Sequence, residues 1–350
     1  MVELLRAQPL EPNRMKRLVF TSTDSGAGCI KAARIADKVV GLAHWLVSGP
    51  APMTSDPLDF FSARAALLGS AGADEVEISD VDLAFREILS KSSMFDRIEF
   101  WADPSCNAQL QLVQFLDWVR PNSDVAGKLA LFQANLPVGC RTPEEIASLE
   151  PSFSKVGEAE LDAATQAWRA YRQPTPEAWF SLFDADLASL PRLSETVLRL
   201  LQELPAADTA LSGTQLQLLN VIAAGERQPW QVLRKLVQCY QRPVYSYWHF
   251  GRMLDNLARC DVPAIAGLTE GPFDMALHDD KARFERYRRS SLELTDLGKA
   301  LVRGEDDFSY HNAIDSWWGG TRLSNDRLWR WDDFGTQLVH PAQDWGKRHE

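Results

Sequence analysis

A short segment rich in small and polar residues, TSTDSGAGCIKAAR (residues 21–34), is the part of the sequence best suited to hold a ligand. It follows an apolar run typical of a buried strand and precedes an alanine-rich run typical of a helix. The first free amides of such a helix point at an anion, and glycines let a ligand approach the backbone. We therefore expect an anion-binding turn whose residues are Asp24, Ser25, Gly26 and Gly28.

The same segment also has a purely structural interpretation. It matches neither the G-x-G-x-x-G nor the G-x-x-x-x-G-K-[ST] phosphate-binding pattern. The carboxylate of Asp24 would repel a phosphate unless a metal ion or a hydroxyl lay between them. A tight strand-to-helix turn, with Asp24 or Ser25 as the helix cap, explains the residues equally well. The sequence leaves both interpretations open.

Further candidate residues lie in or just after the later predicted strands and on the helix that follows. Ligands of open parallel sheets bind beyond the carboxyl ends of the strands, so several of these side chains are expected to share one crevice with Asp24. A histidine among carboxylates suits acid–base chemistry or a divalent metal, but no spacing here is diagnostic of a metal or a cofactor. The additional predicted ligand-binding residues are His44, Ser48, Arg64, Glu99, Trp101 and Asp103.

Three of these residues have simpler interpretations. His44 fits a hydrogen-bonded loop histidine better than a catalytic one. Ser48 lies in V-S-G-P and not in a G-x-S-x-G elbow, so the sequence does not support a hydrolase nucleophile. Arg64 is most simply a helix arginine in solvent, although it could reach an anion.

The elements that would position these residues alternate between strand and helix. Apolar runs separated by helical periodicity predict an open, mostly parallel sheet with helices on both faces, an α/β domain of Rossmann-like type. The predicted strands are 16–22, 38–42, 97–101 and 128–132. The predicted helices are 26–36, 57–68, 81–90 and 109–119.

The remainder of the chain is expected to be mainly helical. Residues 212–224, 229–241 and 245–259 predict three helices, and SLELTDLGKALVRGE (residues 291–305) predicts a strand and a helix, an order typical of a winged helix-turn-helix. A tryptophan-rich tail follows, which should pack on the body. The predicted organisation is a leader (1–15), an α/β domain (16–140), a helical connector (141–210), a winged-helix-like domain (211–305) and the tail (306–350).

Composition limits the function classes. The 350 residues carry a net charge of −11, which on average repels nucleic acid and anionic membranes. No apolar run approaches the roughly 20 residues that span a bilayer, and the start of the chain lacks the pattern of a signal peptide. The five cysteines are odd in number and share no C-x-x-C spacing, which favours reduced thiols and a cytoplasmic location.

One segment is an exception to the acidic character. Residues 212–305 hold 13 basic and 11 acidic residues, a net charge of +2, against −13 for the rest of the chain. A basic cluster in this segment could lie on a phosphate backbone. The residues predicted to contact nucleic acid, as the less favoured function, are Lys281, Arg283, Arg286, Arg288 and Arg289. The predicted third helix, rich in aromatic residues, suits packing or a protein contact better than base reading.

The order of short motifs resembles a bacterial family known as domain of unknown function eighteen-thirty-five, in its long form. The matching segments cover most of residues 17–335 and are Thr23–Ser25, His44–Pro50, Arg64, Glu99–Trp101, Gln109–Leu112, Ala167–Tyr171, Ser189–Leu193, Leu294–Glu305 and Trp317–Trp331. Two positions depart from the family: His44 stands where an aspartate is common, and YSYWHF (residues 245–250) stands where a Gly-Asp pair is common. The resemblance implies the same domain plan and brings no established activity.

Three functions follow as hypotheses. We favour a sensor or regulatory protein whose α/β domain binds a small anionic ligand and whose winged-helix part relays this to a protein partner or, less favoured, to DNA. The second hypothesis is an enzyme acting on a phosphate-containing or other anionic small molecule. The third is a protein-interaction subunit without a ligand. No membrane partner is expected, and the sequence assigns no cofactor.

Overall fold

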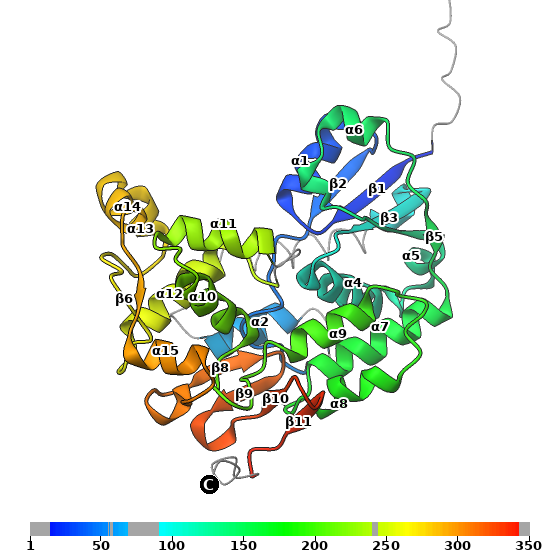
Figure 1. Ribbon diagram of the computed structural model, residues 1–350. Helices are drawn as coiled ribbons and strands as arrows, with labels where there is room; N and C mark the ends of the chain where they lie inside the picture. Colours follow the sequence, from blue (N-terminus) through cyan, green and yellow to red (C-terminus); the bar gives the residue numbers. More distant parts are fainter. Residues whose placement is uncertain (1–14, 55, 57–58, 69–90, 240–243, 343–350) are drawn as a thin grey trace, which may run out of the picture.

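The computed structural model describes residues 15–54, 56, 59–68, 91–239 and 244–342. Figure 1 shows three regions: the sheet with α1, α4 and α6 at the upper right, the helices α10 to α15 at the left, and the hairpins β8 to β11 below them. The predicted helix 81–90 and residues 1–14 of the predicted leader lie outside the described residues.

The N-terminal region contains a five-stranded, mostly parallel sheet of order β2-β1-β3-β4-β5. Its parallel strands are β1 (Arg17–Thr21), β2 (Lys38–Gly41), β3 (Arg97–Ala102) and β4 (Leu129–Gln133). The α/β class and these strands are therefore confirmed. The fifth strand, β5 (Ser154–Lys155), pairs antiparallel to β4 and was not expected, because its two exposed residues carry no strand pattern.

Helices cover both faces of this sheet. Along β3, Ile98, Phe100 and Ala102 belong to the main hydrophobic core, whereas Trp101 belongs to a smaller cluster under the first helix. This alternation is the period of two that a strand imposes on its side chains. The helices are α1 (Asp24–Ala33) and α6 (Pro143–Ala147) on the smaller cluster, and α4 (Cys106–Val119) and α7 (Glu158–Tyr171) on the main core, with α2 (Phe60–Leu68) and α5 (Ser123–Lys128) beside them.

The connector places most of its large aromatic side chains in the core. Trp168, Tyr171 and Trp179 are fully buried, while Phe183 is partly exposed. The start of α6 has a capping box, in which Thr142 and Glu145 each accept from the other's backbone N–H. The remaining connector helices are α8 (Glu177–Phe180) and α9 (Leu193–Leu201).

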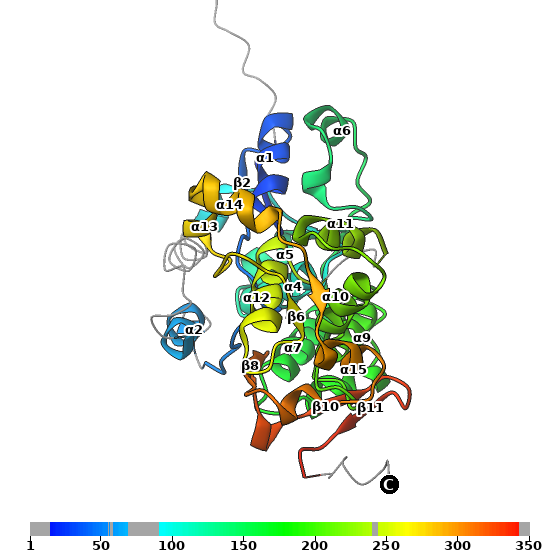
Figure 2. The same ribbon diagram turned by 60° about the vertical axis from the view of Figure 1, so that its left-hand side comes forward.

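The next region has three helices followed by two paired strands, and Figure 2 shows α10, α12 and β6 adjoining the body of the protein. Two helices, α13 and α14, lie between the paired strands. Residues Lys281–Arg288 of the basic cluster are therefore helical, and Arg289 caps the end of that helix. The elements are α10 (Gly213–Ala223), α11 (Pro229–Cys239), α12 (Tyr247–Arg259), β6 (Ile265–Ala266), α13 (Met275–Asp279), α14 (Lys281–Arg288), β7 (Glu293–Leu294) and α15 (Asp296–Val302).

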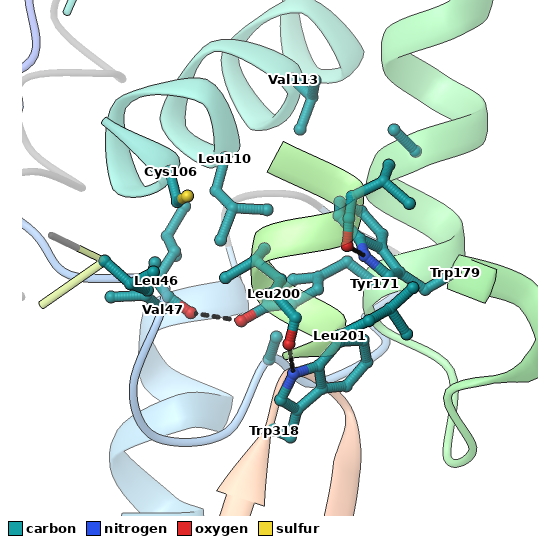
Figure 3. Packing of buried hydrophobic residues seen from close by; sticks show 14 of the residues in the cluster. Leu46, Val47, Cys106, Leu110, Val113, Tyr171, Trp179, Leu200, Leu201 and Trp318 are labelled. Carbon is teal, nitrogen blue, oxygen red and sulfur yellow. Dashed lines mark hydrogen bonds between the residues drawn. The ribbon is translucent and has the colours of Figure 1, made fainter. Parts of the chain in front are cut away.

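The tail forms two antiparallel hairpins that contact the connector. Trp318, Trp329 and Trp331 are buried, and the Trp318 indole N–H donates to the carbonyl of Leu200 in α9 at 2.6 Å, as Figure 3 shows. The backbone N–H of Trp331 donates to the carbonyl of Pro205 at 2.8 Å. The hairpins are β8 (Asp315–Trp318) with β9 (Thr321–Ser324), and β10 (Arg330–Asp332) with β11 (Gln337–Val339).

Two simpler expectations can be compared with the structure. Within the described residues, no helix combines the length and the apolar character that crossing a bilayer requires. The cysteines whose side chains are described, Cys29, Cys106, Cys140 and Cys260, form no disulfide.

Candidate functional site

The carboxyl ends of β1 and β3 form the switch point of the sheet, where the strand order reverses and ligands of such sheets bind. Asp24 and Ser25 lie here, exposed, at the start of α1. Asp103 follows β3 and is buried. Its N–H donates to the Ser22 hydroxyl at 3.1 Å, and its carboxylate accepts from the Val138 N–H at 2.8 Å. Burial raises the pKa of Asp103 to about 6.

The turn itself is capped by its own side chain. The helix cap is Thr23, and not Asp24 or Ser25 as expected: the Thr23 hydroxyl accepts from the Gly26 N–H at 3.1 Å. A Cβ on Gly26 would lie 2.9 Å from the Thr21 hydroxyl, and one on Gly139 only 2.7 Å from the Cβ of Ser25. The small residues therefore serve close packing around the start of α1, which weighs against a phosphate seated there.

Gly28 has a different environment from Gly26. It is exposed, and a Cβ built on it meets nothing within 4 Å. If a neighbouring element or a ligand required a glycine at this position, its atoms would lie close to that Cβ. Gly28 therefore has no visible part in a site.

Glu99 and Trp101 lie inside the fold and not in the expected crevice. Both Glu99 oxygens accept from the Arg17 guanidinium at 2.9 Å, and the Arg97 Nε lies 2.8 Å from one of them. The Trp101 indole N–H donates to the same carboxylate at 2.9 Å. Glu99 is a completely buried carboxylate with two cationic neighbours, so its role is to satisfy charges within the domain.

His44 is a buried, hydrogen-bonded histidine, as its simpler interpretation predicts. Its Nε2 lies 2.8 Å from the Gln114 side-chain oxygen, and its ring meets Phe61 edge-on at 5.2 Å. Burial, which disfavours the charged imidazolium, lowers the pKa of His44 to about 4. His44 is thus neutral near pH 7, and its side chain contacts α4 and α2.

The segment that follows β2, residues 42–50, is held at many points, and we call it the coupling loop. At its start the Leu42 N–H donates to the Thr21 carbonyl at 2.8 Å. Asn107 of α4 accepts from the Leu46 N–H at 2.7 Å. The Tyr171 hydroxyl of α7 donates to the Leu46 carbonyl at 2.9 Å (Figure 3). The loop therefore has one conformation imposed by side chains of two helices.

Arg64 belongs to the same arrangement. Its buried guanidinium donates to the carbonyls of Pro50 at 2.6 Å and Trp45 at 2.7 Å, and also to that of Ser48. Burial lowers the pKa of Arg64 to about 10, which leaves it charged. Arg64 therefore fixes the backbone of the coupling loop and is neither a solvated helix residue nor a free anion receptor.

The end of the coupling loop contacts α12 through residues that sequence reasoning did not pair. The Ser48 hydroxyl lies 2.6 Å from His249 Nε2, and His249 Nδ1 lies 2.7 Å from the Ser246 hydroxyl. The Trp45 ring packs on the His249 ring at 5.1 Å. The S-x-x-H spacing of residues 246–249 indicates a capped helix start, but nothing local to either segment pairs it with Ser48.

A hydroxyl, an imidazole and an orienting group in a row have the geometry of a nucleophile and its base. The electrostatics oppose that role. Burial, with Arg252 and Arg64 nearby, lowers the pKa of His249 to about 4, far from the value near the working pH that suits a general base. The orienting group is a hydroxyl, and the Ser246 N–H also points at Nδ1, at 3.4 Å. The contacts form a hydrogen-bonded junction between the coupling loop and α12.

The basic cluster on α14 is largely paired with carboxylates. Arg283 and Arg286 contact Glu270 at 3.1 and 2.6 Å, and Arg288 contacts Glu285 at 2.9 Å. Arg289 lies 3.9 Å from Glu285, while Lys281 is exposed. Two carboxylates thus offset much of the positive charge that a phosphate backbone would need.

The ten predicted ligand-binding residues therefore fall into separate places and do not form one crevice. The switch point holds Asp24, Ser25, Gly26 and Asp103, the coupling loop and its support hold His44, Ser48 and Arg64, the interior holds Glu99 and Trp101, and Gly28 is on an exposed helix face. In the described part of the chain, no three or more His, Cys, Asp and Glu side chains are grouped to hold a metal ion.

Comparison with known proteins adds no family. No protein-family model matches the chain, and no curated protein shows significant similarity to it.

Proposed function

We propose that this protein is a ligand-responsive regulatory protein. A small molecule binds at the switch point beside Asp24 and Asp103, and the coupling loop transmits its presence to α12. The observation that carries the proposal is the continuity of this loop. It is bonded to the end of β1 through Leu42 and to α12 through Ser48, with every intervening turn held by α4, α7 or Arg64.

The chemistry of the switch point refines the kind of ligand. Asp24 and Asp103 repel an anion and accept from hydroxyl or amino groups, and the Gly26 amide is already bonded to Thr23. A ligand with hydroxyl or amino groups facing the two carboxylates fits best. An anionic group, expected from the sequence, would have to lie on the exposed side near Ser25.

The receiving unit is proposed to be a winged helix-turn-helix. Helices α10, α11 and α12 followed by the β6–β7 pair have its element order, with α13 and α14 inserted between the strands of the wing. The resemblance to family eighteen-thirty-five implies the same element order and the same parallel sheet. We propose on this basis that the chain is related to that family. We also propose that the fold of the first domain is Rossmann-like.

Reading of DNA by this unit is disfavoured. Winged and related domains place the N-terminal residues of the third helix in the major groove. Here these residues already contact other parts of the protein: His249 lies against Ser48, and Tyr247, although exposed, packs on Phe273 at a ring distance of 5.2 Å. A relay to a protein partner agrees better with these contacts.

The test combines ligand screening with a report from α12. Thermal unfolding of the wild type is measured with nucleosides, sugars, amines and their phosphorylated forms. A ligand at about 100 times its Kd adds about 2.7 kcal/mol. Asp103→Asn and Asp24→Ala should remove the response, whereas Asp184→Asn, an exposed site on the connector, should keep it. The ligand should also change hydrogen exchange of α12, and Ser48→Ala should abolish that change. Binding that leaves α12 unaltered contradicts the proposal.

A further inference from the structure

A large groove lies away from the switch point, where α9, α10 and the β10–β11 hairpin meet. These elements adjoin one another in both views (Figures 1 and 2). Its volume is about 1560 Å³. Sites for single small molecules usually occupy roughly 300 to 1,000 Å³, so this groove has room for a longer occupant.

The lining of this groove is strongly acidic. Among the described lining residues, eight side chains are carboxylates and one, Arg199, is basic. Half of these carboxylates have a basic partner: Glu195 pairs with Arg199 at 3.0 Å, Glu305 with Arg303 at 2.5 Å, Asp306 with His311 at 2.9 Å and Asp307 with Arg330 at 2.7 Å. Asp208 and Asp333 have no ion-pair partner within the described chain. The uncompensated charge therefore attracts a cation.

One carboxylate of the groove is buried without a counter-charge. Glu203 accepts from the Thr214 hydroxyl at 2.6 Å and from the Thr214 N–H at 3.3 Å, and no basic side chain of the described residues pairs with it. Burial raises the pKa of Glu203 to about 7. An arriving cation would supply the partner that this carboxylate lacks.

Apolar and aromatic side chains complete the groove. Leu198, Leu216 and the buried Trp331 contribute to its lining. Tyr310 and Phe334 line it as well, although Tyr310 is largely and Phe334 fully exposed to solvent. Exposed aromatic rings beside carboxylates bind apolar side chains and stack under ammonium or guanidinium groups, which is how anchors of protein partners are held.

We propose that this acidic groove docks a basic, amphipathic peptide segment of a partner protein. Lysine or arginine side chains of the segment face Asp208, Asp333 and the other carboxylates, and its apolar side chains contact Phe334, Tyr310 and the leucine lining. The size of the groove and the exposed rings favour a peptide over a free small polycation. The proposal is independent of the switch point and stands whether or not a small ligand binds there.

The test uses fluorescence anisotropy of a short fluorescein-labelled peptide of alternating lysine and leucine, with the full-length protein. Binding should weaken as salt is added. The double variant Asp208→Asn/Asp333→Asn should bind about tenfold more weakly. Its matched control, Asp124→Asn/Asp184→Asn, removes the same charge elsewhere and should bind as the wild type does. Phe334→Ala should weaken binding about fivefold, against no effect of Met94→Ala, another exposed apolar site.

Two results would overturn the proposal. If the peptide affinity falls equally in the groove variant and in the matched control, the peptide responds only to the overall charge of the protein. Displacement by spermine at the peptide's own affinity, together with no effect of Phe334→Ala, means that the groove takes a small polycation and not a peptide. Because Asp208 and Phe334 are exposed, their substitution leaves the fold intact, and circular dichroism of each variant checks this.

Discussion

Ser48 and His249 are 201 residues apart in the chain, yet the Ser48 hydroxyl lies 2.6 Å from the His249 imidazole. The first residue ends a loop that begins at the sheet, and the second lies in the first turn of α12. This contact is the most direct hydrogen-bonded link between the α/β region and the helices α10 to α12 in the described residues, which is why the proposed relay runs through it.

Replacing Ser48 by alanine should loosen this link without disturbing either side. Loss of one hydrogen bond costs about 1 kcal/mol of unfolding free energy, measured by urea denaturation. Amides of the first turns of α12 should exchange faster, because His249 loses one of its two side-chain partners. Ser62→Ala, an exposed site on α2, is the control and should leave both quantities unchanged. Unaltered hydrogen exchange in α12 after Ser48→Ala would show that the contact does not transmit a change from the coupling loop to α12.

The two glycines of α1 should respond in opposite ways to alanine. Gly26→Ala places a methyl group 2.9 Å from the Thr21 hydroxyl and 3.2 Å from that of Thr23, so we expect a loss of about 1 to 3 kcal/mol. Gly28→Ala meets nothing and should stabilise the helix by about 0.5 to 1 kcal/mol. Thermal and urea unfolding of both variants measure this. A loss of stability in Gly28→Ala would indicate that Gly28 has a role that its contacts in the structure do not explain.

Glu99 should be among the most sensitive polar residues of the first domain. Glu99→Ala leaves the Arg17 guanidinium and the Trp101 indole without their shared acceptor, and it removes the carboxylate that pairs with Arg97. We expect a loss of about 3 kcal/mol, because both arginines are partly exposed and regain some hydration. Glu285→Ala, which removes an exposed pair with Arg288, should cost less than about 1 kcal/mol. Similar losses for the two variants would contradict the burial argument.

Glu203 predicts a particular pH dependence of stability. Its pKa is about 7 in the folded protein against an ordinary 4.5, so the folded state binds its proton more tightly than the unfolded state does. The stabilisation that comes from this tighter proton binding is fully present below pH 4.5 and is lost as the pH rises through about 7. The free energy of unfolding should fall by roughly 3 kcal/mol over this range. Glu203→Gln should remove that decline. Urea unfolding of both proteins from pH 4.5 to pH 8 tests this, and parallel curves would contradict it.

The strands of the sheet and several helix starts could be read from the sequence because their signals are local. Apolar runs marked β1 to β4, and the residues Thr142, Glu145 and Ser212 marked capped helix starts that the structure contains. Local signals failed where the elements are short or exposed, as in β5, or where polar composition hides a helix, as in α13 and α14.

The candidate site was predicted less well for a physical reason. The sequence identified Asp24 and Asp103 as residues near strand ends, and the topology of a parallel sheet does bring their strands together. It could not tell that Glu99 faces Arg17 and Arg97, because this depends on which face of β3 is covered and on the register with β1.

By itself the sequence determined the α/β character of the first domain, the mostly parallel pairing of its apolar strands and the capped starts of two later helices, at Thr142 and Ser212. These follow from side-chain periodicity and from hydrogen bonds between residues a few positions apart. Only the tertiary structure decided that Arg64 holds the coupling loop, that Ser48 meets His249, and that carboxylates of α9, the tail and the loops between them line one groove. Such contacts join residues from distant segments, and no local pattern specifies their partners.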